Sequence, residues 1–119
     1  MGLILHMLAR SEWNAVKNGE SYSPESIEED GFIHFSQVNM ITTVANALYV
    51  GQQDMVVLVV DESKINAELI YEDCYETGHA FPHVYGPLNL DAVNDVVDFP
   101  CNENGEFDLP EPLQSLLKQ

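Results

Sequence analysis

The sequence predicts an α+β fold with short helices early in the chain and strands concentrated late. Helical spacing and capping residues occur mainly before residue 50, whereas runs of β-branched residues dominate after it. Strands and helices do not alternate strictly, which argues against a doubly wound parallel sheet. With 119 residues, of which 45% are hydrophobic, the chain is expected to form one domain, residues 1–119, around a modest core.

The chain is expected to begin with a strand followed by a short helix. Residues 3–8 form an apolar run typical of a buried strand, and only His6 interrupts it. Residues 12–17 are predicted to be a helix, because Ser11 can cap its start and Gly19 can end it in a left-handed conformation.

A second short helix is expected over residues 25–30. Ser23 can cap this helix, with Pro24 in its first turn, where the missing backbone donor does no harm. Gly31 is expected to stop it, since glycine adopts the left-handed conformation that commonly ends a helix.

The next segment is expected to be a strand followed by the clearest helix of the chain. Residues 32–36 alternate as a strand does, which puts Phe32, His34 and Ser36 on one face. Ser36 is then expected to cap a helix over residues 38–49, where apolar side chains recur at a spacing of three and four.

The second half of the chain is expected to consist mainly of strands. Residues 56–60 form a nearly continuous β-branched run, which predicts a central strand buried on both faces. Residues 69–72 and 92–99 are predicted to be further strands. Residues 81–88 contain two prolines and are expected to be a stiff segment that cannot be an ordinary central strand, because proline lacks a backbone donor.

Charge and composition narrow the range of partners. Twenty acidic and four basic residues give a net charge of −16, so nucleic-acid binding is not expected. No apolar run reaches the roughly 18 residues that span a bilayer, and no signal peptide is recognisable, which predicts a cytoplasmic protein without membrane association. Cys74 and Cys101 lack the spacing of a redox or metal motif and are expected to be reduced thiols.

Histidines are the main candidates for chemistry, because His6, His34 and His83 interrupt otherwise apolar segments. Each alone is more typical of a hydrogen-bonded structural residue, but three such interruptions favour a shared pocket. His79 and His83 have a spacing that suits a metal site on a helix. Pro82 lies between them and breaks such a helix, so no metal site is predicted.

Other side chains are candidates for ligand binding. Arg10 precedes a predicted helix, where it could help to hold a pyrophosphate; a solvated surface arginine is the alternative. Glu72 ends an apolar strand, where it could orient a histidine or act as a base instead of facing solvent. Phe81 and Tyr85 are expected to pack around an apolar ring of a bound ligand. Ser36 is expected to lie beside that ligand.

Several of these residues match a known family. The sequence resembles domain-of-unknown-function family 952 over nearly its whole length. The matching residues are Leu5-His6, Trp13, Gly19, Tyr22, Pro24, Gly31-Phe32-Ile33-His34-Phe35-Ser36, Tyr49, Gly51, Tyr71-Glu72 and Phe81-Pro82-His83-Val84-Tyr85-Gly86-Pro87-Leu88. That family is in turn similar to the ADP-ribosyltransferase fold, a small split β-sheet around an NAD cleft.

This second resemblance implies a small split mixed β-sheet of the ADP-ribosyltransferase-like type, with NAD as cofactor. By analogy, His6 on the first strand contacts the cofactor and His34 lines the nicotinamide site. His83 stands where many relatives carry glutamate, which argues against ordinary transfer to protein acceptors, and Glu72 supplies the missing carboxylate. The implied catalytic residues are His34, His83 and Glu72, and the expected cofactor-binding residues are His6, Arg10, Ser36, Phe81 and Tyr85.

The function implied by this resemblance is binding of NAD or a related nucleotide, with ADP-ribosyl transfer or glycohydrolysis as the chemistry. The first alternative is a non-enzymatic module that binds a small ligand or a protein through the same cleft. The second alternative is an acidic structural partner protein, which the net charge alone would explain.

Overall fold

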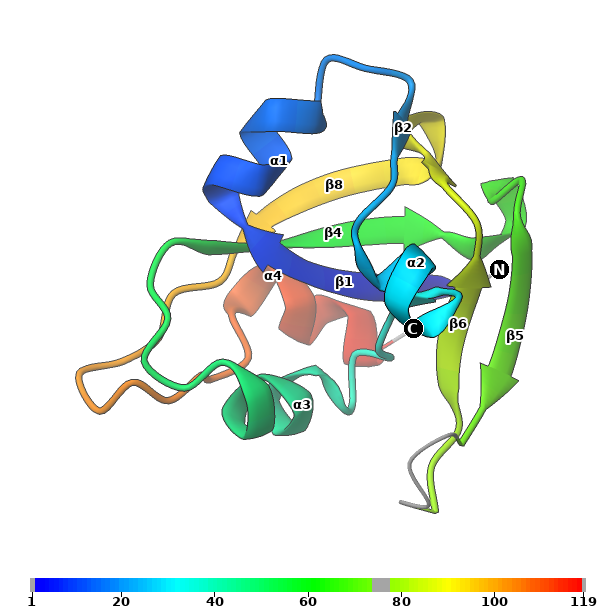
Figure 1. The fold of residues 1–119 in the computed structure, drawn as a ribbon. Helices are drawn as coiled ribbons and strands as arrows, with labels where there is room; N and C mark the ends of the chain where they lie inside the picture. The colour runs from blue at the N-terminus through cyan, green and yellow to red at the C-terminus, as the bar shows by residue number, and fades with distance from the viewer. Residues whose placement is uncertain (1, 74–77, 119) are drawn as a thin grey trace.

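The computed structural model describes residues 2–73 and 78–118 and confirms an α+β architecture of small antiparallel sheets and short helices (Figure 1). The central sheet has the order β1-β4-β8, and the second sheet has the order β3-β6-β5. A two-stranded ribbon pairs β2 with β7. Their bounds are β1 (Leu3–Ala9), β2 (Ser21–Tyr22), β3 (Ile33–His34), β4 (Met55–Asp61), β5 (Glu68–Glu72), β6 (Phe81–Tyr85), β7 (Leu88–Asn89) and β8 (Val93–Asp98). All of these pairings are antiparallel, whereas the resemblance implied a mixed sheet.

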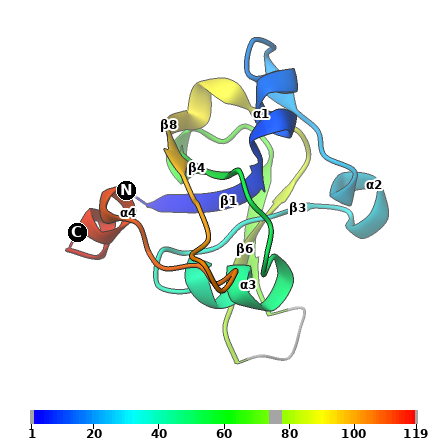
Figure 2. The ribbon, with the colours of Figure 1, turned by 90° about the vertical axis from the view of Figure 1, so that its left-hand side faces the viewer.

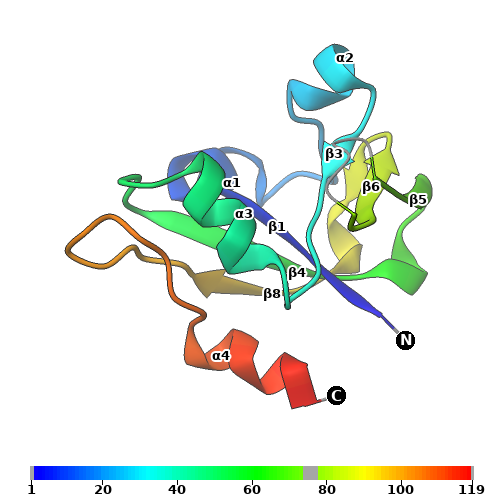
Figure 3. The same ribbon diagram turned by 90° about the horizontal axis from the view of Figure 1, so that it is seen from below.

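The helices are short and lie around the sheets. Figures 2 and 3 show α4 on the opposite side of the molecule from α1 and α2. None of the helices in the described part of the chain is long and apolar enough to cross a lipid bilayer. Their bounds are α1 (Arg10–Val16), α2 (Ser26–Asp30), α3 (Ile41–Leu48) and α4 (Glu111–Gln114), with 3-10 turns η1 (Glu62–Lys64), η2 (Leu90–Ala92) and η3 (Ser115–Lys118).

β4 is the central strand that the β-branched run predicts. It is hydrogen-bonded to β1 on one side and to β8 on the other, and every residue from Met55 to Asp61 is buried. Val56, Leu58 and Val60 belong to one hydrophobic cluster, with Ile33 and Val84 of the second sheet. The alternate residues Met55, Val57 and Val59 belong to another cluster, which α3 and α4 cover through Ile41, Ala45 and Leu113. The strand therefore separates two cores, one on each of its faces.

The predicted helix starts are wrong at three serines. α1 begins at Arg10 rather than after Ser11, and α2 begins at Ser26 with Glu25, not Ser23, at its N-cap. Ser36 lies five residues before α3, whose N-cap is Met40. The backbone N–H and C=O of Ser36 both bond to Leu5, at 2.7 and 2.8 Å, so this residue is held in an extended bridge and cannot start a helix.

The two glycine predictions have different outcomes. Gly31 ends α2 with φ of 90°, as expected. Gly19 does not provide a left-handed cap, because α1 ends at Val16 and its C-cap, Lys17, is right-handed. Cys101 is a free, half-buried thiol, and Cys74 lies outside the described residues.

Pro82 lies in the middle strand of the second sheet, which contradicts the expectation that its segment could not be a central strand. Its carbonyl accepts a hydrogen bond of 3.0 Å from the backbone N–H of Phe35, just past the end of β3. The N–H and C=O of one strand residue point to the same side, so the missing donor of Pro82 also falls where β3 has ended. The proline therefore costs the sheet no bond within the paired length of β3.

The double burial of β4 yields a stability prediction. Val57→Asp or Val59→Asp places an unpaired carboxylate in a core where the valines are 0% and 5% exposed. We expect either variant to be unfolded at neutral pH, because such a charge costs several kcal/mol against a total stability of about 5–15 kcal/mol. The matched control is Val50→Asp, since Val50 is 54% exposed and should tolerate the same change. Circular-dichroism melting curves of both core variants that overlay the wild type would show that β4 is not the core strand.

Candidate functional site

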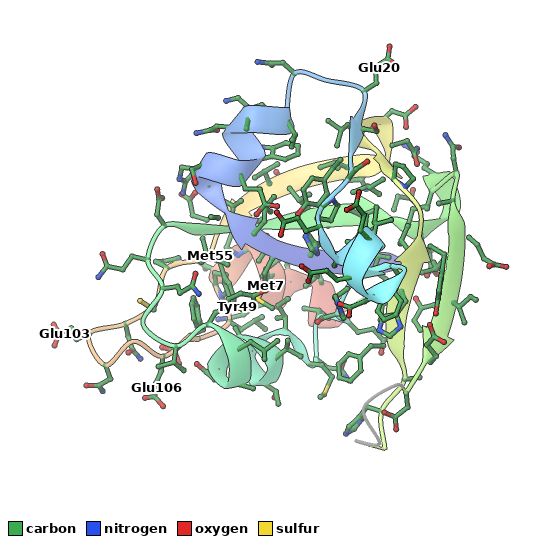
Figure 4. All side chains as sticks on the ribbon, in the orientation of Figure 1. Met7, Glu20, Tyr49, Met55, Glu103 and Glu106 are labelled. Carbon is green, nitrogen blue, oxygen red and sulfur yellow. The ribbon has the colours of Figure 1, made fainter. Side chains whose placement is uncertain are left out.

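A cavity of about 840 Å³ opens along the free edge of β1. Five consecutive residues of the strand, from Leu5 to Ala9, line it. Successive side chains of a strand point to opposite faces, so a cavity touched by all five lies at the strand edge rather than over one face. Figure 4 shows Met7, Tyr49 and Met55 grouped between β1 and α3. The wall is mainly apolar, with polar groups supplied by His6, Glu12, Tyr22, Ser26, His34, Ser36, Thr43, Tyr49, Gln52, His79 and His83.

His6 ties β1 to its neighbours on this side of the cavity. Its Nδ1–H donates to the backbone carbonyl of His34 at 2.7 Å, and its Nε2 lies 3.0 Å from the Tyr22 hydroxyl. Burial lowers the pKa of His6 to about 4, although the hydrogen bond to the His34 carbonyl acts in the opposite direction. The ring is therefore neutral near pH 7, with its proton on Nδ1 and a lone pair on Nε2.

Tyr22 continues this chain of hydrogen bonds to Glu12 in the first turn of α1. The hydroxyl of Tyr22 lies 2.8 Å from Oε2 of Glu12. Burial, together with the neighbouring Glu12 carboxylate, raises the pKa of Tyr22 well above its ordinary value. Tyr22 therefore keeps its proton, and both Tyr22 and Glu12 line the cavity beside His6.

His34, in β3, also lines the cavity. Its side chain is 41% exposed, and Nε2 lies 2.9 Å from Oδ2 of Asp30 at the end of α2. The ring centroid is 4.8 Å from that of Phe32 and 5.6 Å from that of His83. Pairing of β3 with β6 places His34 directly opposite His83, so the segments around these two histidines lie side by side.

His83, in β6, is fully buried and also lines the cavity. Its Nδ1–H donates to Oε2 of Glu72 at 2.9 Å, and the Tyr85 hydroxyl donates to the same oxygen. The ring of Phe32 stacks on His83 with centroids 3.9 Å apart. Glu72 thus orients a histidine, one of the roles considered from the sequence. His83 therefore anchors this wall through a buried hydrogen bond and a ring stack.

The structure brings only part of the predicted site together. His6, His34, His83, Ser36 and Phe81 line the cavity, whereas Glu72 and Tyr85 lie behind His83 and do not line it.

Arg10 points away from the cavity, because Nε and Nη2 pair with Asp54 and Asp98 at 2.6 and 2.5 Å. These two carboxylates raise the pKa of the Arg10 guanidinium. The alternative of a surface arginine is therefore the better description.

Sequence reasoning did not identify Glu12 and Tyr22 as site residues. Tyr22 appeared only among the family matches, and Glu12 has no motif or spacing that distinguishes it from the other acidic residues. The signal that connects them to His6 is spatial, since β2 runs past β1 after the turn that follows α1. Within the described residues, no group of three His, Cys, Asp or Glu side chains is arranged to hold a metal ion.

Comparison with known proteins places the chain among uncharacterised relatives. The family model described as "Protein of unknown function (DUF952)" matches residues 7–96. The crystal structure of protein CC0527 from Caulobacter crescentus, a structural genomics target, is 29% identical, with a TM-score of 0.83, and the match covers 94% of this chain and 98% of that chain. Its solution NMR structure has the same identity, full coverage of both chains and a TM-score of 0.78. No curated protein matches the chain.

The environment of His6 predicts a pH dependence of stability. Its pKa falls from 6.5 in the unfolded chain to about 4 in the folded protein, so the unfolded state binds more protons between these values. The contribution of the neutral His6 ring to the free energy of unfolding is fully present above pH 6.5. As pH falls towards 4, it decreases by on the order of 3 kcal/mol.

Urea unfolding between pH 4 and 7.5 checks this prediction, with His6→Gln as the comparison because glutamine does not titrate. The stability difference between the wild type and His6→Gln should grow from pH 4 to 6.5. A difference that is flat over this range, or a His6 ring that titrates in NMR near 6.5, would contradict the prediction.

The role of Glu72 yields a third prediction. Glu72→Ala removes the acceptor that both His83 and Tyr85 use, and we expect it to lower the free energy of unfolding by about 2 kcal/mol or more. Glu68→Ala is the matched control, because Glu68 is an exposed acid on the same strand. Equal unfolding free energies of the two variants in urea titrations would mean that Glu72 does not hold the histidine wall.

Proposed function

The chain belongs to the DUF952 family of proteins of unknown function, and we propose that it binds a nicotinamide-bearing nucleoside or nucleotide along the edge of β1. The observation that carries the proposal is the cavity itself. Its volume of about 840 Å³ lies within the range of small-molecule and cofactor sites, and its wall is apolar with a few polar groups. The expected analogy with the ADP-ribosyltransferase fold agrees with the positions of His6 on β1 and His34 on β3.

The backbone of Met7 supplies a recognition element that suits a carboxamide. Leu5 directs both its N–H and its C=O outward, to Ser36. Residues two apart on a strand direct their backbone groups to the same side, so Met7 presents one donor and one acceptor at the cavity edge. The carboxamide of nicotinamide offers the complementary acceptor and donor. Edge-strand groups of this kind pair with the backbone amides of an added strand, and a primary carboxamide offers the same two groups.

Charge favours the nicotinamide riboside half of such a ligand. Among the lining residues that the structure describes, none is Lys or Arg, and Glu12 is the single acid. The whole chain carries −16. The positively charged nicotinamide ring is therefore attracted, while a pyrophosphate meets no fixed cation and is repelled by the field of the protein.

The chemistry that we propose is cleavage of the bond between nicotinamide and ribose, with transfer of the ribosyl group to water or to an acceptor hydroxyl. This bond breaks through an oxocarbenium-like ribose, which a carboxylate and oriented dipoles in the cavity stabilise. Binding without cleavage is the second candidate. The mainly apolar wall favours it, because such a wall holds a ring without any reactive group.

A ligand series tests the proposal by NMR shift perturbation. We expect 1-methylnicotinamide to bind more tightly than nicotinamide because it carries the positive charge. Nicotinate should bind least, because its carboxylate loses the donor and adds a negative charge. NAD should bind more tightly than ADP-ribose, because NAD carries the positively charged nicotinamide ring and ADP-ribose lacks it.

His34→Ala should weaken binding of 1-methylnicotinamide several-fold, because it removes a polar side chain from the wall. The control Arg10→Gln should bind as the wild type does, since Arg10 lies outside the cavity. Absence of shift changes with all ligands at millimolar concentration would end the nicotinamide hypothesis.

A further inference from the structure

We propose that Glu12, Tyr22 and His6 form a single proton-accepting unit on the cavity wall, with Glu12 as the group that receives the proton. The reason lies in the number of hydrogens that the contacts between these three side chains require. The proposal deepens the proposed function by naming its base, and it depends on that function only for the molecule that gives up the proton.

The contacts fix where most hydrogens must lie. The carbonyl of His34 can only accept, so Nδ1 of His6 carries a hydrogen. Two links remain, from Nε2 to the Tyr22 hydroxyl at 3.0 Å and from that hydroxyl to Glu12 at 2.8 Å. Each link needs one hydrogen, and the hydroxyl of Tyr22 supplies only one. With His6 neutral and Glu12 ionised, the unit is therefore one proton short.

The missing proton has one favourable place. Burial disfavours an imidazolium at His6, and Tyr22 keeps its own proton. Glu12 remains, and it lies at the rim because its residue is exposed in α1. When Glu12 is ionised, Tyr22 donates to the carboxylate, and two lone pairs face each other at the His6 link. When Glu12 is protonated, it donates to Tyr22, and Tyr22 turns to donate to His6.

Other charged or titratable groups near the unit are few. His34 faces His6 from β3, and Tyr49 faces Tyr22 and Glu12 from the end of α3. Burial, and to a smaller extent the Glu12 carboxylate, raises the pKa of Tyr49. Tyr49 is therefore neutral at physiological pH. Arg10 on the same helix as Glu12 is engaged with Asp54 and Asp98. No Lys or Arg lines this part of the described cavity to hold Glu12 in its ionised form.

The corresponding reaction step balances with water as the nucleophile. The water oxygen bonds to the ribose carbon while the bond from that carbon to the ring nitrogen breaks. The electron pair of the broken bond stays with nicotinamide, which becomes neutral. The proton released by the water passes to Glu12, and Tyr22 reorients towards His6. General-base help of this kind typically accelerates a reaction by about 10²–10⁴-fold.

The test begins with the ligand-free protein, so that it does not depend on nicotinamide binding. NMR follows the Glu12 carboxyl carbon and the His6 ring nitrogens against pH in the wild type and in Tyr22→Phe. In the wild type we expect the Glu12 carboxyl carbon and the His6 ring nitrogens to shift together over the same pH range. We call this the shared step; it arises because Glu12 protonation redirects the Tyr22 hydroxyl. In Tyr22→Phe the His6 nitrogens should no longer respond at the pH where Glu12 titrates.

Glu12→Gln provides a second, independent measurement. The amide of glutamine can donate to Tyr22, which then donates to His6, so the chain of hydrogen bonds is complete without an added proton. We expect this variant to melt at a higher temperature than the wild type at pH 7.5. The control Glu20→Gln makes the same charge change at an exposed residue outside the chain of contacts. Its melting temperature should not rise by as much.

Two results would overturn the proposal. One is a His6 response that is the same in the wild type and in Tyr22→Phe; the other is a Glu12→Gln variant less stable than Glu20→Gln. If nicotinamide ligands fail to bind while the shared step is present, the proposed function falls but the proton-accepting unit stands. If they bind and are cleaved, Glu12→Gln should lose at least tenfold in rate at saturating nicotinamide riboside.

Discussion

The burial of β4 on both faces is the constraint on which the rest of the structure depends. A strand with no polar face must be covered twice, so the chain builds two hydrophobic clusters instead of one. One cover comes from α3 and α4, and the other from the second sheet and the segment around Tyr22. Because the second sheet packs over a face of the central sheet and does not extend its edge, most of β1 has no strand beyond it. That open edge is where the cavity lies.

The short bridge between Leu5 and Ser36 sets the length of this opening. It closes one end of the β1 edge with two backbone hydrogen bonds and brings the chain from β3 across to α3. The same bridge places His34 next to His6, whose ring holds the His34 carbonyl. The wall of the site is thus fixed on one side by backbone hydrogen bonds. On the other side it is fixed by the hydrogen bond between buried His83 and Glu72. A site held in this way is preorganised before any ligand arrives.

The sequence predicted the features that arise from local pattern. The run over residues 56–60 indicated a doubly buried strand, and Gly31 could end a helix because its backbone conformation is local. The errors arise from contacts between distant segments. Ser36 looked like a cap, but its backbone is used by Leu5, and Pro82 is accommodated only because β3 ends beside it.

The site was predicted in part for the same reason. Histidines in apolar runs are rare enough to be noticed, and His6, His34 and His83 indeed gather at one cavity. Arg10 was wrongly predicted to bind the ligand. It forms ion pairs with Asp98 of β8 and with Asp54 before β4, and no local signal in the sequence shows this. Glu12 could not be distinguished from the other nineteen acids without knowing where Tyr22 lies.

Charge balance connects the acidity of the chain with the reaction that we propose for the cavity. In a mainly apolar cavity an isolated charge is costly, and a change of net charge during a reaction is costly as well. In the proposed complex, a cationic nicotinamide ring beside an ionised Glu12 would be neutral overall. After the bond to ribose breaks, the ring would be neutral, and a proton from water on Glu12 would keep the cavity neutral. Under this proposal the cationic ring and then the proton, which completes the Tyr22 and His6 links, balance the same carboxylate in turn, one before the bond breaks and one after.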